Sequence, residues 1–309
     1  MTGEIEIPVS LDAAREVLVD RPVGLVPFQI RAQFLAVQGV EQAVDAAVPA
    51  VEDYYVGAVL DLPTADVPVT TTMLEQWSVT MEDVVDAGAT ARSQDEAPVE
   101  AFGNALVVRS MAFAAAALRN PASVSGLRPG STPVIVIPDV GHTLVGFVED
   151  EESLRALAVA AERVLANTDR SVSATPLVHR DAGWERFEWP QSVAMETGRM
   201  QRRWYHLQYR AAKEVLNRTY AAAGVDVFVA TLELAQQGDD GPMETYATVT
   251  QDVHTVIPRA DMIVLNGGDG RMQRVPFERF AELPGVLTAS VGTVPEHFEV
   301  TRFPAELLG

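Results

Sequence analysis

Two aspartate–histidine pairs are the residues in this sequence whose spacing best suits chemistry. Asp139 precedes His142 by three residues, and Asp252 precedes His254 by two. A carboxylate can orient an imidazole ring, which titrates near neutral pH, and both groups can bind a metal ion. A turn aspartate also commonly accepts hydrogen bonds from its own backbone. We therefore expect no cofactor or assigned metal, with Asp139, His142 and His254 as the candidates if a metal or acid–base site exists.

A basic stripe on one long predicted helix is the second candidate site. The helix covers residues 192–223, and its basic residues recur at helical spacing beside an apolar stripe that contains Trp204. The stripe could pair within the chain, dock an anionic protein or ligand, or bind nucleic acid, which the overall charge opposes. The partner-binding candidates are Arg199, Arg203, Trp204, His206, Arg210 and Lys213.

The charge balance limits the partners that this chain can have. Its 309 residues include 43 acidic and 23 basic side chains, for a formal net charge of −20. This excess repels nucleic acid and anionic membranes, so we expect neither as a partner. The absence of cysteine excludes disulfides, thiolate metal sites and cysteine nucleophiles. The sequence shows no signal peptide and no apolar stretch of transmembrane length, so we expect a cytoplasmic protein.

Motifs for other chemistries are absent from the sequence. It contains neither GxxxxGK[ST] nor a GxGxxG that opens a helix, and NGGDG at residues 266–270 indicates a turn. It also lacks GxSxG, and Ser125 and Ser290 have no histidine close in sequence, although a distant segment could supply one. These absences favour a protein that is not an enzyme, without deciding the question.

The elements that would position these side chains are clearest between residues 132 and 168. The β-branched run at residues 134–137 predicts a strand, PDVGH predicts a turn, and residues 143–148 predict a second strand. A helix follows the acidic residues 149–152, which the helix dipole favours at that end. Asp139 and His142 would therefore lie at the turn of a β-hairpin.

The remaining pattern alternates between short helices and short strands. Helix starts are predicted at Ser10, Thr72 and Thr80, where Thr80 and Asp83 have capping-box spacing. Residues 40–60 have a helical pattern that Pro49 should interrupt. Further helices are predicted at residues 109–119 and 276–283, and residues 29–37 fit a strand or a helix. Strands are predicted at residues 4–9, 101–108, 177–179, 184–189, 225–234, 245–250, 262–265, 286–291 and 298–303, with an irregular connection at 120–133.

Three segments occur in a recognisable order along the middle of the chain. They are VTTTMLEQWSVTMEDVVDAGATA, then TPVIVIPDVGHTLVGF, then the helix and hairpin that end in WERFEW. Together they resemble the bacterial YtpQ-like family over residues 63–189. The resemblance implies a mixed α/β fold, and it transfers no catalytic residues.

The sequence as a whole predicts an α+β fold with largely antiparallel sheets, packed helices and two domains. Residues 1–190 would form an α/β domain, with an optional further break near 120–132, and residues 191–309 a helix followed by an antiparallel sheet. The expected function is a non-enzymatic accessory protein that recognises another protein through its surface, with homo-oligomer formation left open. The alternative is a small-ligand-binding protein or metal-dependent enzyme with a site near Asp139 and His142.

Overall fold

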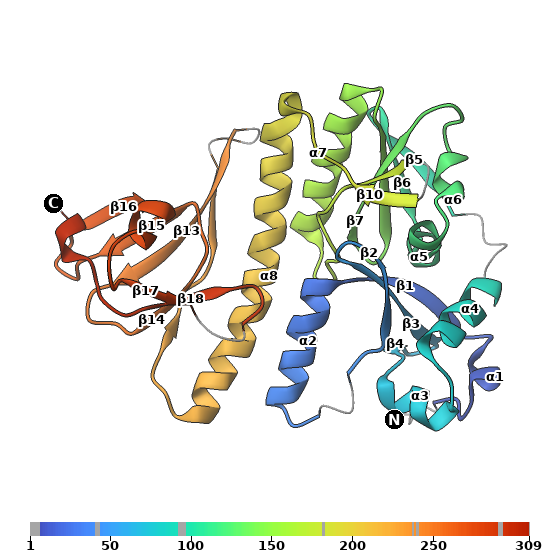
Figure 1. Cartoon of the computed structure of the whole chain (residues 1–309), viewed down its shortest axis with the longest axis horizontal. Helices are drawn as coiled ribbons and strands as arrows, with labels where there is room; N and C mark the ends of the chain where they lie inside the picture. Colours follow the sequence, from blue (N-terminus) through green and yellow to red (C-terminus); the bar gives the residue numbers. More distant parts are fainter. Residues whose placement is uncertain are drawn as a thin grey trace. The chain divides into compact units, whose positions relative to one another are not determined.

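The computed structural model describes residues 7–40, 44–91, 97–180, 183–236, 238, 241–289 and 293–308. Several mainly antiparallel sheets carry packed helices (Figure 1), which confirms the predicted α+β class. The chain divides into two compact units, Met1–Met200 and Gln201–Gly309. The sequence-based boundary at residue 190 and the optional break near 120–132 stay predictions.

The first unit contains a four-stranded antiparallel sheet with β3 (Tyr54–Leu62) at its centre. β3 pairs with β1 (Leu18–Gly24), β2 (Ala47–Val51) and β4 (Ala65–Pro68). Asp20 lies opposite Ala58 and Arg21 opposite Gly57. Because successive side chains of a strand point to opposite faces, these two charged neighbours lie on different sides of the sheet.

The predicted hairpin forms the centre of the second sheet of this unit. β7 (Pro133–Asp139) is buried along its whole length and pairs with β8 (His142–Phe147). The six strands are antiparallel and are ordered β10-β9-β7-β8-β6-β5. The outer strands are β5 (Val99–Phe102), β6 (Ala105–Arg109), β9 (Leu177–Arg180) and β10 (Gly183–Arg186). The predicted turn residues Asp181 and Ala182 lie outside the described residues.

The helices of the first unit begin mostly at side-chain caps. Thr80 and Asp83 cap α4 reciprocally, because the Thr80 N–H donates to Asp83 Oδ2 at 2.9 Å and the Asp83 N–H to Thr80 Oγ1 at 3.2 Å. Asp150 caps α7, whereas Thr70 rather than Thr72 caps α3. The helices are α1 (Leu11–Ala14), α2 (Leu25–Val37), α3 (Thr71–Trp77), α4 (Met81–Ala91), α5 (Met111–Arg119), α6 (Ala122–Ser125) and α7 (Glu151–Asn167).

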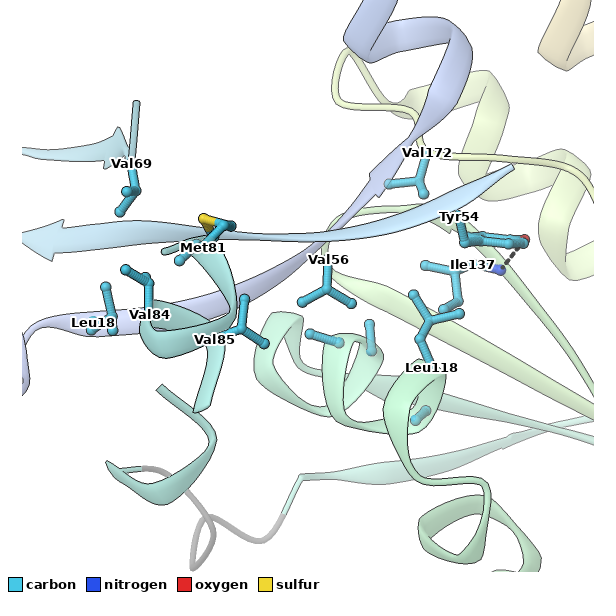
Figure 2. Packing of buried hydrophobic residues seen from close by; sticks show 14 of the residues in the cluster. Leu18, Tyr54, Val56, Val69, Met81, Val84, Val85, Leu118, Ile137 and Val172 are labelled. Carbon is cyan, nitrogen blue, oxygen red and sulfur yellow. Dashed lines mark hydrogen bonds between the residues drawn. The ribbon is translucent and has the colours of Figure 1, made fainter. Parts of the chain in front are cut away.

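One buried cluster runs through both sheets of the first unit. In Figure 2, Leu18 of β1 and Val56 of β3 face Val84 and Val85 of α4. Tyr54 joins the sheets by hydrogen bonds, since its hydroxyl donates to the Thr175 carbonyl at 2.6 Å and accepts the Ile137 N–H at 3.3 Å. Because that hydroxyl is enclosed in the core, these bonds replace the water it would otherwise bind.

Helix α8 (Ala194–Ala223) confirms the long predicted helix. A single 3-10 turn, η2 (Gln191–Val193), leads into it. Gly224 follows the helix with φ +67°, a conformation that glycine adopts without steric cost. Residues 201–223 belong to the second unit.

Two four-stranded sheets and α9 (Phe277–Ala281) complete the second unit. One sheet is ordered β11-β14-β18-β17 and the other β12-β13-β15-β16, and their buried side chains share one cluster. The β11–β14 and β13–β15 pairs are parallel, and the others are antiparallel. The strands are β11 (Phe228–Val229), β12 (Glu233–Gln236), β13 (Met243–Thr250), β14 (Thr255–Pro258), β15 (Met262–Asn266), β16 (Met272–Pro276), β17 (Leu287–Ala289) and β18 (His297–Val300).

Residues 40–60 differ most from the sequence prediction. The predicted interrupted helix is wrong, because β2 and β3 occupy its described part. Pro49 is accommodated because β2 pairs with β3 alone, and an edge strand tolerates a missing N–H. An alanine- and valine-rich run fits a helical and a strand period equally well, and tertiary pairing decides between them.

Smaller differences occur in other short segments. The helix predicted to start at Ser10 ends at Ala14, and the strand β1 begins soon afterwards at Leu18. The sequence also missed β14 and β16, whose short runs contain or end in proline. Residues 4–6 of the strand predicted at 4–9 lie outside the described residues, and residues 7–9 are not in a strand.

Candidate functional site

Asp139 holds His142 at the β7–β8 turn. Its Oδ1 accepts the Gly141 N–H at 2.9 Å and lies 2.8 Å from His142 Nδ1. Asp139 is 8% exposed, and the His142 side chain retains 27%. This contact favours a proton on Nδ1 and leaves Nε2 as the basic nitrogen. The structure therefore brings this sequence-predicted pair together, in a geometry that serves a turn and an acid–base group alike.

His254 lies in the second unit and forms a separate candidate. Its Nε2 lies 2.6 Å from Glu299 Oε1, and both side chains are 45% exposed. The pair lines a cleft of about 430 Å³ together with Asp252, Arg302 and Phe303. Asp252 itself has φ +62°, an uncommon conformation that aspartate tolerates better than most residues. The histidine's partner is thus Glu299, which sequence spacing could not reveal.

Ser125 does have a histidine partner in space. Its Oγ donates to the Pro121 carbonyl at 3.2 Å and lies 3.4 Å from His179 Nδ1. The next two amides already donate to the carbonyls of Ala122 and Val124, so they are not free to stabilise an oxyanion. This pair lacks the surroundings of a nucleophilic serine, and Ser290 lies outside the described residues.

The first turns of the basic stripe face the interior of the first unit. The Arg199 side chain is 6% exposed, and its Nε lies 3.1 Å from Glu162 Oε2 of α7. A second ion pair joins the same helices, between Arg155 Nη1 and Glu196 Oε1 at 2.6 Å. Arg199 therefore holds α8 against α7 and is not available to a partner.

The later part of the stripe is more open and belongs to the second unit. Arg203 and Trp204 are half-buried, and the Trp204 ring stacks edge-on against Tyr205. His206 Nδ1 bonds the Leu232 carbonyl at 2.7 Å. Arg210 is exposed, and among the described residues its guanidinium makes no hydrogen bond or ion pair.

Lys213 lies beside the aromatic ring of Phe228, a neighbour that the sequence did not indicate. Its ammonium donates to Thr231 Oγ1 at 2.6 Å and lies 5.5 Å from the centre of the Phe228 ring. Phe228 is 51% exposed. We call Arg210, Lys213 and Phe228 the basic–aromatic patch. Phe228 lies on β11, which follows the end of α8, so a helical periodicity could not find it.

Three arginines lie near one another in the first unit, and their positions in the sequence did not predict this. Arg21 Nη2 lies 2.6 Å from Asp45 Oδ2, and Arg31 Nε lies 3.0 Å from the other oxygen of the same carboxylate. Arg170 Nη1 lies 3.5 Å from Asp66 Oδ2. Burial lowers the pKa of Arg21, although the charge and hydrogen bond of Asp45 oppose the shift. We call Arg21, Arg31 and Arg170 the arginine cluster.

Asp20 is a buried carboxyl on the opposite face of the same strand. It is 6% exposed, its Oδ1 has no hydrogen-bond partner in the described part of the chain, and Arg119 Nη1 lies 3.9 Å from its Oδ2. Arg119 also pairs with Asp86. Burial raises the pKa of Asp20 to about 7, although the Arg119 charge opposes the shift.

The described residues contain no group of three or more histidine, aspartate or glutamate side chains arranged to hold a metal ion. In that same part of the chain, no helix combines the length and apolarity required to cross a membrane.

No family model, curated protein or solved structure matches this chain. The resemblance to the YtpQ-like family therefore stays a prediction, and the function must be argued from the sites themselves.

Proposed function

We propose that this protein recognises an acidic, partly apolar segment of another protein through the basic–aromatic patch. The observation that carries the proposal is the exposed Arg210, which has no ion-pair partner among the described residues and shares a helix face with Lys213, whose ammonium lies over the half-exposed ring of Phe228. Helical spacing of three residues puts the two cations side by side. The patch concentrates positive charge in a chain whose net charge is −20.

The residue types of the patch suit protein recognition. Arginine and aromatic residues are enriched at the centres of protein interfaces, where each can contribute most of the binding energy. Lys213 is already fixed by Thr231 and Phe228, so little side-chain entropy would be lost when a partner covers the ring. Phe228 would supply apolar contact, and Arg210 would pair with a carboxylate of the partner.

The first prediction concerns capture of this partner. Arg210→Glu combined with Phe228→Ala should lower the amount of partner recovered about 30-fold or more, as expected when interface anchors worth about 2 kcal/mol are lost. Recovery should be measured by affinity purification from native cells at low and moderate salt, followed by quantitative mass spectrometry. The captured protein should carry an acidic segment, and its isolated peptide should compete.

Arg218→Glu is the matched control. Arg218 lies on the same helix, its side chain is 46% exposed, and it pairs with Glu214 within its own turns. Reversal there changes the net charge as Arg210→Glu does and should leave capture within about twofold, because rim charges contribute little. Equal loss in the control, or full capture by the folded double variant, would remove the patch from the proposal.

Small-ligand binding is a second candidate function, and the cleft around His254 favours it. Two carboxylates line the cleft. The guanidinium of Arg302 donates to both oxygens of Glu306, from Nη1 to Oε2 at 3.0 Å and from Nη2 to Oε1 at 2.8 Å. Within the described residues, Asp252 makes no hydrogen bond or ion pair. We propose that this cleft accepts a small organic amine, with Phe303 as part of an apolar wall. The Asp139–His142 turn remains the other proposed location for such chemistry.

The second prediction tests this cleft. Putrescine and ethanolamine at about 10 mM should raise the melting temperature by about 2–3 °C relative to sodium chloride of equal ionic strength. Glu299→Gln should lower the rise, because it removes one of the two carboxylate charges that the amine would meet. Glu278→Gln is the control, since Glu278 is 67% exposed and lies outside the cleft. A rise that survives Glu299→Gln unchanged would show that the amine binds elsewhere.

A further inference from the structure

The arginine cluster places three cationic side chains around one stretch of β1. Arg21 comes from β1, Arg31 from α2, and Arg170 from the segment that follows α7. This segment passes the end of β1, since a Cβ added to Gly24 would lie 1.9 Å from the Val172 carbonyl oxygen. The cluster is thus assembled from three segments, of which the one with Arg170 is distant in sequence from the other two.

The carboxylates of the cluster do not balance its positive charge. Asp45 is 5% exposed, and each of its two oxygens is used by one arginine. Asp66 is the acidic neighbour of Arg170 and is 39% exposed. Among the described residues, three guanidinium groups therefore meet two carboxylates. Burial lowers the pKa of Arg21 most, the charge and hydrogen bond of Asp45 oppose this shift, and the positive charges of Arg31 and Arg170 lower the pKa further by smaller amounts.

The accessible donors of the cluster belong to its outer members. The Arg21 side chain is 15% exposed, and its buried Nε has no hydrogen-bond partner within the described residues. The Arg31 and Arg170 side chains are each 49% exposed, so their remaining N–H groups face solvent. Phe28 lies one helical turn before Arg31 and stacks on Tyr55, with ring centres 6.2 Å apart.

We propose that the arginine cluster is a binding site for a small oxyanion, a phosphate or carboxylate group of a soluble molecule. Arg31 and Arg170 contact the oxygens of the ligand, and Arg21 attracts it from beneath as a buried charge. Planar guanidinium groups match the spacing of such oxygens through paired hydrogen bonds. The proposal is independent of the basic–aromatic patch, because the cluster lies in the first unit.

A purely structural ion network is the competing explanation. Asp45 between two arginines could by itself tie α2 to β1. Such a network gains most when its charges cancel, whereas this cluster keeps surplus positive charge in a chain that is otherwise strongly acidic. The net charge of −20 also disfavours non-specific anion binding, so a measured anion effect would report a local site.

The experiment is a thermal titration of the full chain with inorganic phosphate, sulfate and acetate against sodium chloride at equal ionic strength. Phosphate at about 10 mM should raise the melting temperature by about 3 °C over chloride, as expected for a ligand some tenfold above its Kd. A larger shift with phosphate than with acetate identifies a phosphoryl ligand, and the reverse order identifies a carboxylate. No shift with any of these oxyanions would overturn the proposal.

Variants locate the effect. Arg170→Ala should lower the phosphate-induced rise in melting temperature at least threefold. It leaves the contacts of Asp45 with Arg21 and Arg31 in place, so it tests binding even if Arg31→Ala proves unstable. Arg109→Ala is the control, because Arg109 is 57% exposed and pairs with Glu100 away from the cluster. If phosphate shifts all three variants equally, the anion acts outside the cluster and the assignment fails. Isothermal calorimetry with phosphate should show the same order.

Discussion

Replacing Asp20 with asparagine is expected to stabilise the protein, and the gain should grow by about 2–3 kcal/mol between pH 5 and pH 8. Asp20 is buried in β1 with an unpartnered Oδ1, and burial raises its pKa to about 7 from an ordinary value of 3.8. Its charge in the folded state is therefore unfavourable at neutral pH. Asparagine keeps the shape of the side chain and removes the charge.

The direction follows from proton binding. Between pH 3.8 and about 7 the folded protein holds a proton on Asp20 that the unfolded chain has lost. Stability from this group is therefore greatest below pH 4 and declines as the pH rises, by about 4 kcal/mol in total at 1.4 kcal/mol per pKa unit. Urea denaturation of both proteins at pH 5, 6, 7 and 8 measures the difference. A gap that stays constant over this range would mean that Asp20 titrates below it.

Gly88 of α4 lies against the Asp20 side chain and provides a second variant that tests this buried carboxyl. A Cβ added there would lie 2.2 Å from Asp20 Oδ1, and the three nearest heavy atoms all belong to Asp20. Gly88→Ala should therefore destabilise the natural protein by about 1–3 kcal/mol. With Asp20→Ala already present, the same change should stabilise by about 0.5–1 kcal/mol, because alanine then brings only its helix propensity to α4. A sign that does not change would show that another obstacle surrounds Gly88.

Local signals predicted a large part of the fold. The capping box at Thr80 and Asp83, the hairpin around PDVGH and the long helix through Trp204 each depend on residues a few positions apart, and the structure confirms all three. The prediction for residues 40–60 was wrong because an alanine- and valine-rich run fits the periods of a helix and of a strand equally well. Pairing with β1 decides that part of it forms a strand.

The sites were less predictable than the fold. Spacing found the Asp139–His142 pair, whose members share one turn. It could not find Glu299 for His254, Phe228 for Lys213 or Asp45 for Arg21, because these partners come from other strands and loops. Nor could it separate Arg199 from Arg210, which share the basic stripe but differ completely in exposure. Helical periodicity identifies a face, and only the packing around the helix shows which part of that face stays open.

Arg199→Glu is expected to destabilise the protein by about 3–5 kcal/mol, the usual cost of breaking a buried ion pair. The Arg199 side chain is 6% exposed and lies against Glu162, so the substitution would place two carboxylates together in the interior. Arg210→Glu should change stability by less than about 0.5 kcal/mol, because Arg210 is exposed. Urea denaturation followed by tryptophan fluorescence compares the two.

The charge swap is the decisive control. Arg199→Glu combined with Glu162→Arg restores opposite charges between α7 and α8 and should recover at least about 1 kcal/mol of the loss. No recovery would mean that the arginine acts through packing and not through its pairing with Glu162. Loss of partner binding in any Arg199 variant would then follow from disruption of the packing between α7 and α8. Partner binding must therefore be tested at exposed positions of the stripe, with Arg210 first.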